Sequence, residues 1–252
     1  MPDLPAATAI RPASTVMLVR DATAGLEVFT LQRVAEMAFA AGMTVFPGGG
    51  VDARDADDAI PWTGPDARWW AQRLRLDAAA ARGQVVAAVR ELYEETGVLL
   101  ADPGGPEAVG GIVVESEYDA TRAAVAAHES SLAAVLRARG ARLRADLLRP
   151  WARWVTPPGL PRRYDTFFFV AALPHGQRAD CVTTEAVAGG WHRPADVLRA
   201  GERGEVGLMP PTVAMLVDLA AAQRVDDLMT VPREMEPVRH GLPVKSANRT
   251  AG

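Results

Sequence analysis

The sequence predicts a single α/β domain, and three observations lead to that prediction. Residues 15–20 (TVMLVR) and 26–32 (LEVFTLQ) are strand-like, and the segment 21–25 between them is typical of a turn, so together they predict a hairpin. Residues 84–96 carry apolar side chains at helical spacing and precede Gly97, a residue type that commonly ends a helix. Predicted helices and strands then interleave with frequent turns, which favours one domain over two.

The other elements follow from the same periodicities and from turn residues. Segments with helical spacing and alanine-rich segments predict helices, and short aromatic or β-branched runs predict strands. We expect helices at residues 67–82, 118–139, 195–200 and 212–224, strands at 151–155 and 165–172, a loop at 51–65, and an irregular tail from residue 231.

Composition and charge narrow the classes of function. The net charge of -4 argues against bulk electrostatic binding to nucleic acid or to an anionic membrane. The chain begins without a secretory signal pattern and has no apolar run of membrane-spanning length. Cys181 is the single cysteine, so no intrachain disulfide is expected, and a cytoplasmic location is the prediction.

The strongest chemical signal is the acidic end of the helix predicted at 84–96. Residues three or four apart share a helix face, so Glu91, Glu94 and Glu95 should converge, and Arg90 can pair with Glu94. A dense set of carboxylates suits a hard divalent cation such as Mg²⁺, which prefers oxygen ligands. A solvated acidic face is the alternative, but the apolar stripe of this helix places the acidic face outward or in a cleft.

Residues 90–98 (RELYEETGV) resemble the second half of the MutT/Nudix box and match every specified position of it. Aligning the glycine of the box with Gly49 places Asp55 where the family has glutamate. The family has seven residues between that position and the arginine, whereas this chain has 34, from Ala56 to Val89. The resemblance implies the Nudix fold, a mixed β-sheet sandwiched between helices (α/β/α).

Two further stretches resemble a Nudix subgroup that carries a long insertion in the box. They are residues 37–49 (MAFAAGMTVFPGG) and the segment from Trp154 to Phe168, with WVTP followed by RRYDTFF. The subgroup includes the peroxisomal coenzyme A/acyl-CoA diphosphatase branch. The resemblance therefore implies hydrolysis of a nucleoside diphosphate derivative by metal-activated water, with coenzyme A or acyl-CoA as the leading substrate.

The resemblance also implies roles for particular residues. Glu91, Glu94 and Glu95 are the metal-ligand positions for Mg²⁺ or Mn²⁺, with the Gly48 carbonyl as a further ligand. The general base is either Glu91 or Glu185, because many members of the family place a base in a loop after the box.

Arginines are the candidates for binding substrate phosphates, since Lys245 is the only lysine. Arg162 and Arg163 precede a strand and can bind phosphate. Arg33 and the aromatic residues Phe39 and Phe46 are further candidates to line the substrate site. An ion pair of the arginines with Asp165 or with a box carboxylate is the structural alternative.

Other functions and other sites stay open or are weaker. An ADP-ribose, NADH or dinucleotide pyrophosphatase and a non-catalytic nucleotide-sensing domain are the alternatives, and a homodimer is left open. The four histidines, His128, His175, His192 and His240, lack metal-binding spacing, and we expect them to be structural or exposed. Gly48–Gly50 lacks the Gly-Lys-Ser/Thr of a Walker loop.

The insertion carries its own expectation. We expect residues 1–252 to form one domain, with the extra residues at about 56–83 forming a loop plus the helix at 67–82. They should lie beside the substrate cleft. We expect Trp69 and Trp70 in core packing, with packing on the substrate or on a partner subunit as the alternative.

Overall fold

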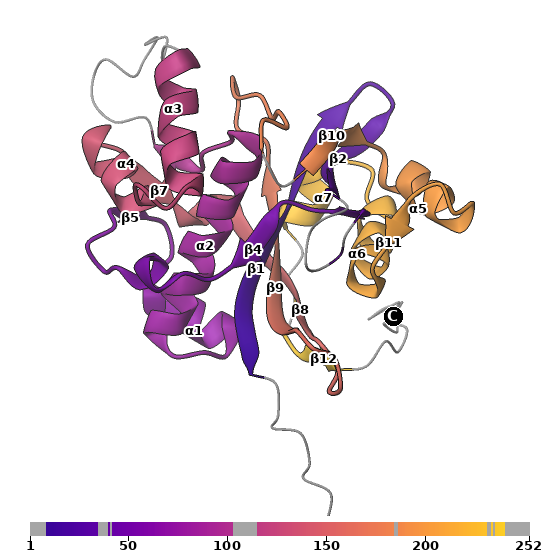
Figure 1. Cartoon of the computed structure of the whole chain (residues 1–252), viewed down its shortest axis with the longest axis horizontal. Helices are drawn as coiled ribbons and strands as arrows, with labels where there is room; N and C mark the ends of the chain where they lie inside the picture. The colour runs from indigo at the N-terminus through magenta and orange to yellow at the C-terminus, as the bar shows by residue number, and fades with distance from the viewer. Residues whose placement is uncertain are drawn as a thin grey trace, which may run out of the picture.

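The computed structural model describes residues 9–34, 40, 42–102, 115–183, 186–230, 233 and 235–239. Their centre is a mixed sheet whose strands run in the order β11-β3-β2-β1-β9-β8-β12, with β10 paired to β2 and β4 paired to β1 (Figure 1). The strands are β1 (Ile10–Ala22), β2 (Gly25–Arg33), β3 (Met43–Val45), β4 (Gly48–Gly50), β8 (Leu148–Val155), β9 (Arg163–Ala172), β10 (Ala186–His192), β11 (Gly207–Leu208) and β12 (Pro237–Arg239).

The predicted hairpin is confirmed, because β1 and β2 pair antiparallel with Ala22 opposite Gly25. The two long central strands, β1 and β9, run parallel over ten residue pairs, from Ile10 opposite Arg163 to Val19 opposite Ala172. The β1–β9 pairing explains why both strands are apolar on successive residues, since both faces of the central sheet are buried.

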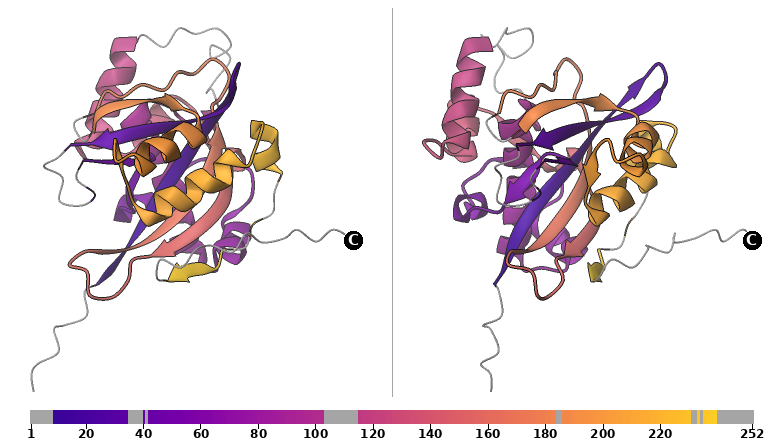
Figure 2. Two further views of the ribbon diagram at one scale, coloured as in Figure 1. Left: turned by 90° about the vertical axis from the view of Figure 1, so that its right-hand side faces the viewer. Right: turned by 45° about the vertical axis from the view of Figure 1, so that its right-hand side comes forward.

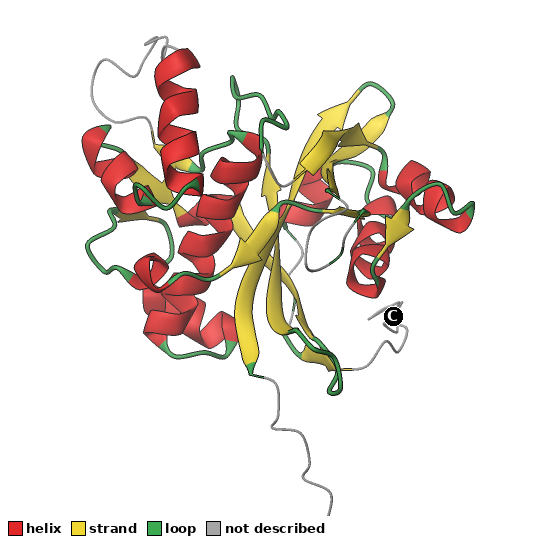
Figure 3. Cartoon of the chain, viewed as in Figure 1, coloured by secondary structure: helices red, strands yellow, loops and turns green. Residues whose placement is uncertain are grey.

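Helices cover both faces of the sheet (Figures 2 and 3). Val16 and Leu18 of β1 join the core beneath α2, whereas Met17 and Val19 join the core on the opposite face with α6 residues. The helices are α1 (Ala67–Leu74), α2 (Ala78–Thr96), α3 (Glu115–Ala126), α4 (Leu132–Ala138), α5 (Pro194–Glu202), α6 (Pro210–Ala220) and α7 (Val225–Met229). The expected α/β/α sandwich with a mixed sheet is therefore present.

The box helix α2 starts earlier than predicted. Residues 67–82 are not one helix, because Arg75 takes a left-handed conformation (φ 56°) at the end of α1. Asp77 then accepts a hydrogen bond from Ala80 N and caps α2, which continues without a break to Thr96. Gly97 ends α2 with φ 74°, as predicted from its position.

The insertion packs on the same core as the box helix. Ile60, Trp70 and Leu74 belong to the core cluster that contains Val89, and the Trp70 ring meets Phe169 edge to face at 6.0 Å. Trp69 is 40% exposed, so only Trp70 fits the expected core packing. A small sheet ordered β5 (Trp62–Thr63), β7 (Arg142–Arg144), β6 (Ala101–Asp102) ties the insertion to later segments.

Four further predictions need correction. Residues 118–139 are not one helix but lie in α3 and α4, because the chain turns at 127–131. The helix predicted at 212–224 is α6, which ends earlier than predicted, before α7 starts. The loop at 51–65 contains the 3-10 turn η1 (Ala53–Ala56) and β5, and a second such turn, η3 (Ala145–Leu147), precedes β8. The tail is not wholly irregular, since β12 pairs parallel with β8; residues 240–252 lie outside the described part. Within the described residues, no helix is long and apolar enough to cross a membrane.

Candidate active site

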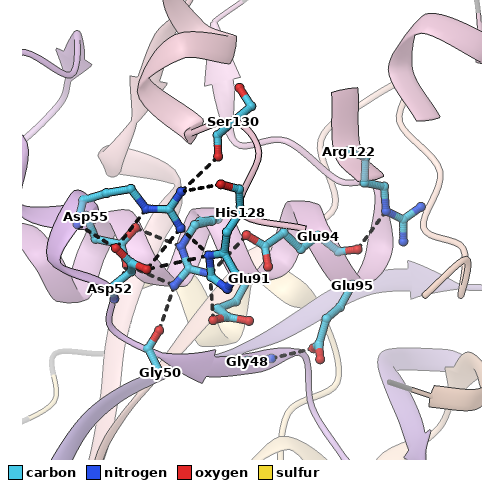
Figure 4. Close-up of polar contacts among 12 residues, drawn as sticks. Gly48, Gly50, Asp52, Asp55, Glu91, Glu94, Glu95, Arg122, His128 and Ser130 are labelled. Carbon is cyan, nitrogen blue, oxygen red and sulfur yellow. Dashed lines mark hydrogen bonds and ion pairs between the residues drawn. The ribbon is translucent and has the colours of Figure 1, made fainter. Parts of the chain in front are cut away.

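Arg90 organises the carboxylates of the box helix. Its guanidinium is buried and donates to Glu91 Oε1 at 2.8 Å and to Glu94 Oε1 at 3.1 Å (Figure 4). The predicted pair between Arg90 and Glu94 is thus present. Burial acts to lower the pKa of Arg90, but the hydrogen bonds that Arg90 donates to Asp55 and the charge of Glu91 outweigh it and raise that pKa.

Asp55 is the third carboxylate on Arg90, and its position in the box is now explained. It is 2% exposed and accepts two hydrogen bonds from Arg90, at 2.9 Å and 3.0 Å. It also accepts from Asp52 N at 2.8 Å and closes the turn η1. Asp55 therefore anchors the start of the insertion to the box helix α2, and the 34 residues that follow do not disturb that anchor.

Glycines bring the strand β4 against the box helix. Gly48 N donates to Glu95 Oε2 at 2.8 Å, and a side chain at Gly48 would come within 2.4 Å of the backbone oxygen of Ser14. A side chain at Gly49 would come within 2.6 Å of Glu91 Oε1. The backbone at residues 48–49 can therefore lie directly against Glu91 and Glu95 only because glycine stands at both positions.

The charge balance of this cluster fits a cation. Burial raises the pKa of Glu94, and the charge of Arg90 lowers it by less. Asp55, Glu91 and Glu94 all contact the guanidinium of Arg90, so three carboxylates lie close together in a partly dry site. Clustered oxygen donors suit a hard divalent ion. Within the described residues, no three acidic, histidine or cysteine side chains are already gathered in metal-binding geometry.

A pocket of about 830 Å³ opens beside the cluster. One side, here the box side, consists of Gly48–Asp52 with Arg90, Glu91 and Glu94. The opposite side, here the far wall, is assembled from the ends of β2 and β8, the β8–β9 turn, β9 and the start of α6. Its residues include Arg33, Trp154, Val155, Thr156, Pro157, Leu160, Arg162, Tyr164, Phe168 and Met209–Thr212.

The predicted site residues fall in different places. Arg33 and Arg162 line the pocket, as does Phe46, whereas Arg163 donates to the Thr156 carbonyl at 3.1 Å and is absent from the lining. The alternative of an ion pair with Asp165 is wrong, since Arg153 holds that carboxylate at 2.6 Å. Glu185 and Phe39 lie outside the described residues.

The insertion is not where we expected it. The pocket lining contains Val51 and Asp52 but none of residues 56–83, so the expectation that the insertion lies beside the cleft is wrong. The insertion covers the opposite side of α2, where Trp70 and Leu74 are buried. Cys181 is also absent from the lining, and burial raises the pKa of its thiol, in agreement with an unreactive residue.

Sequence reasoning missed two parts of the site. His128 and Asp52 line the pocket near Glu94. The sequence signal for His128 is its position after an alanine-rich helix, where glycine is the usual residue. Trp154, Leu160 and Met209–Thr212 line the far wall. No local pattern identifies far-wall residues, because they meet only once the β8–β9 hairpin and α6 are packed.

Comparison with known proteins agrees with this geometry. A family model described as the NUDT19 Nudix domain matches residues 71–219, more than half of the chain. The chain belongs to the Nudix hydrolase family, in the NUDT19 branch. A crystal structure of a NUDIX hydrolase from Alicyclobacillus acidocaldarius is 30% identical, with a TM-score of 0.73 over 91% of this chain and 99% of that one.

Three relatives with assigned names agree with this family assignment. It is 26% identical to the acyl-coenzyme A diphosphatase NUDT19 of Gallus gallus, over 86% of this chain and 68% of that protein. It is 28% identical to the protein of that name from Homo sapiens, over 87% and 68% respectively. It is 26% identical to the putative nudix hydrolase 7 of Caenorhabditis elegans, of which it spans 62%. The chain is thus a pyrophosphohydrolase of the class that acts on small nucleotide-diphosphate substrates.

Proposed function

We propose that this Nudix hydrolase cleaves the diphosphate linkage of coenzyme A or of an acyl-CoA. The observation that carries the proposal is the pocket of about 830 Å³, which joins the box carboxylates to a largely apolar far wall. An apolar wall suits a substrate that carries a pantetheine arm beyond its nucleotide. The names of the chicken and human relatives support the same substrate class.

The proposed metal-holding groups are Glu91, Glu94, Glu95 and the carbonyl of Gly48. The clustering of carboxylates around Arg90 supports them, and Mg²⁺ or Mn²⁺ fits their oxygen donors. When bound, the cation polarises phosphoryl oxygens and favours deprotonation of water. The protein keeps these carboxylates in place through Arg90 and through the N–H of Gly48, which fixes Glu95.

The general base is proposed to be Glu91 or Glu185. Glu91 is 13% exposed, lines the pocket and bonds to Arg90, which orients one of its oxygens. Comparing kcat in Glu91→Gln and Glu185→Gln at saturating Mg²⁺ separates the two. The base is the residue whose loss lowers kcat and flattens the rise of rate with pH.

The arginines of the far wall are proposed to hold the nucleotide phosphates. Arg33 and Arg162 line the pocket and can reach a ligand. Arg163 acts by a different route, since its Nε fixes the Thr156 carbonyl and so shapes the turn that carries Leu160 and Arg162. Val155, Leu160, Phe168 and Pro210 offer apolar surface to the pantetheine and acyl arm.

The proposal extends to domain organisation, location and assembly. We propose that residues 1–252 form one domain, supported by the core that the insertion shares with α2. A reducing compartment such as the cytoplasm fits the single cysteine. A homodimer is left to measurement by light scattering.

The decisive experiment is a Mg²⁺-dependent substrate screen with products identified by mass. Coenzyme A, dephospho-CoA and acyl-CoA species are compared with ADP-ribose, NADH and diadenosine polyphosphates. The proposal requires 3′,5′-ADP and a phosphopantetheine as products, with the highest kcat/KM on a CoA species. Faster cleavage of ADP-ribose or NADH would overturn the CoA assignment, and binding without turnover of any diphosphate would show a nucleotide sensor.

A further inference from the structure

His128 stands at a helix end that normally takes glycine. Helix α3 closes with Glu129 N bonded to Ala124 O at 2.9 Å and His128 N bonded to Val125 O at 3.0 Å. These are the two bonds of a Schellman motif, which puts His128 at the left-handed position, and its φ is 60°. Glycine accepts that conformation without steric cost, whereas a histidine there is held by its surroundings.

The surroundings that hold His128 come from the turn η1, just before the insertion. Arg54 donates to the carbonyl of Ser130 at 3.2 Å and contacts His128 Nδ1 (Figure 4). Asp52 in turn fixes Arg54 through bonds of 3.0 Å and 3.1 Å, and these bonds lower the pKa of Asp52 to about 2. Asp52 N is bound to Asp55, which is bound to Arg90. A chain of contacts therefore runs from the box helix to the imidazole ring.

The contact with Arg54 determines the tautomer of His128. A guanidinium can only donate hydrogen bonds, so Nδ1 must accept, and the proton of the neutral ring is on Nε2. In the part of the chain that the structure describes, Nε2 has no bonding partner. The ring is 64% exposed and lines the pocket together with Arg90 and Glu94.

We propose that His128 is a substrate-contacting residue, whose Nε2–H donates a hydrogen bond to an oxygen of the diphosphate beside Glu94. Arg54 and Asp52 are positioning residues that fix its tautomer and orientation. The inference rests on the diphosphate hydrolysis proposed above and adds a donor outside the box. It also gives a role to the Asp52–Arg54 pair, which precedes the insertion, whereas residues 56–83 are absent from the pocket lining.

Two substitutions of His128 separate contact with substrate from a structural role. His128→Gly removes the ring and supplies the residue that the left-handed position favours, so Tm should stay within about 3 °C of the wild type or rise. Its kcat/KM should fall roughly tenfold or more, as expected for a lost hydrogen bond to a charged group. His128→Gln restores an N–H near the place of Nε2, so it should recover activity yet be less stable than His128→Gly. His175→Ala, at an exposed loop histidine absent from the pocket lining, is the matched control.

These measurements use whichever diphosphate the wild type cleaves fastest, so a wrong CoA assignment does not affect them. Full activity of His128→Gly would overturn the proposal, as would equal activity of the glycine and glutamine variants. If the wild type turns over no diphosphate, affinity for ADP with Mg²⁺ by calorimetry replaces activity. Equal affinity of wild type and His128→Gly would then contradict the contact.

A spectroscopic readout tests the positioning role independently. In ¹⁵N-labelled protein at pH 8, the His128 resonances, assigned by their absence in His128→Gly, should show a protonated Nε2 and a bare Nδ1. Arg54→Met removes the donor and should yield a mixture of tautomers, with a loss of kcat/KM similar to that of His128→Gly. A wild-type ring protonated on Nδ1 would contradict the role of Arg54.

Discussion

The two sides of the pocket are built in different ways. On the box side, Arg90 binds Asp55, Glu91 and Glu94, and Gly48 N binds Glu95, so each carboxylate is fixed by a neighbour before any ligand arrives. The far wall is made of strand ends, a turn and a helix start that come from separate parts of the sequence. Under the proposed function, the box side would hold the diphosphate, which all the substrates share, and the far wall would contact the part of the substrate that differs between them.

The largest expected effect is on the box side, at Glu95. Glu95→Gln keeps an oxygen that can accept from Gly48 N but removes the negative charge, so the fold should survive while a metal ligand is weakened. Mutating a residue that only hydrogen-bonds to a metal ligand lowers metal affinity or activity roughly 10–100-fold. Loss of a ligand itself should therefore lower kcat by about 100-fold or more. Steady-state rates at saturating Mg²⁺ measure this.

Glu202→Gln, at an exposed residue of α5, is the control for Glu95→Gln and should leave the rate unchanged. Near-full Mg²⁺-dependent activity in Glu95→Gln would remove this residue from the proposed metal site. Circular dichroism and Tm of both variants show whether the fold is retained.

The next effect is on stability and concerns the buried link between the insertion and the helix. Asp55→Ala leaves Arg90, 5% exposed, without its two-bond partner. Breaking a buried pair costs about 3–5 kcal/mol, and the remaining bonds to Glu91 and Glu94 favour the lower end. For a domain of this size, about 3 kcal/mol corresponds to a fall in Tm of roughly 6–12 °C.

Asp58→Ala, in the same segment but exposed, is the control and should shift Tm by little. If Asp55→Ala matched Asp58→Ala in Tm, the Asp55–Arg90 pair would not be what joins the insertion to the box helix.

The contrast between the two sides also decides what could be predicted from sequence. Glu91, Glu94 and Arg90 lie within five residues on one helix, so helical periodicity alone brings them together. Gly97 and the hairpin of β1 and β2 were predicted for the same local reason. The break at Arg75 was missed because it depends on a left-handed residue that is not glycine, as at His128. The far wall was missed apart from its arginines, because Leu160 and Met209 meet only through tertiary packing.

The far wall should show a smaller effect, on substrate choice. Arg162→Ala should lower kcat/KM for coenzyme A roughly tenfold or more, since a charge-assisted bond contributes about 1.5–3 kcal/mol. The loss should be much smaller for dephospho-CoA, which lacks the 3′-phosphate. The measurement is kcat/KM for coenzyme A and for dephospho-CoA, with the wild type and with Arg162→Ala.

Arg163→Ala is the matched variant for Arg162→Ala, because its side chain bonds to the Thr156 carbonyl and is absent from the pocket lining. This variant should lower kcat/KM for both substrates alike and lower Tm. An equal loss on both substrates in Arg162→Ala would assign the 3′-phosphate to another residue, with Arg33 the next to test.

The smallest expected effect is a pH dependence of stability on the box side. Burial raises the pKa of Glu94 above its ordinary value of 4.5. The folded state then binds the proton more tightly than the unfolded state, so this contribution is present below the unfolded pKa and is lost as pH rises through the folded pKa. In EDTA, wild type should therefore lose stability relative to Glu94→Gln between pH 4 and pH 8, by a few degrees of Tm at most.

Mg²⁺ should reverse that trend, because a cation bound to Glu94 compensates the charge that burial penalises. Adding Mg²⁺ at pH 8 should raise the Tm of wild type more than that of Glu94→Gln, since ligand binding stabilises the folded state in proportion to its affinity. If the difference in Tm between wild type and Glu94→Gln stayed constant from pH 4 to pH 8 in EDTA, the site would not disfavour the charged Glu94 carboxylate. An equal response of both proteins to Mg²⁺ would place the cation away from Glu94 and leave the box side with an ion-pair role only.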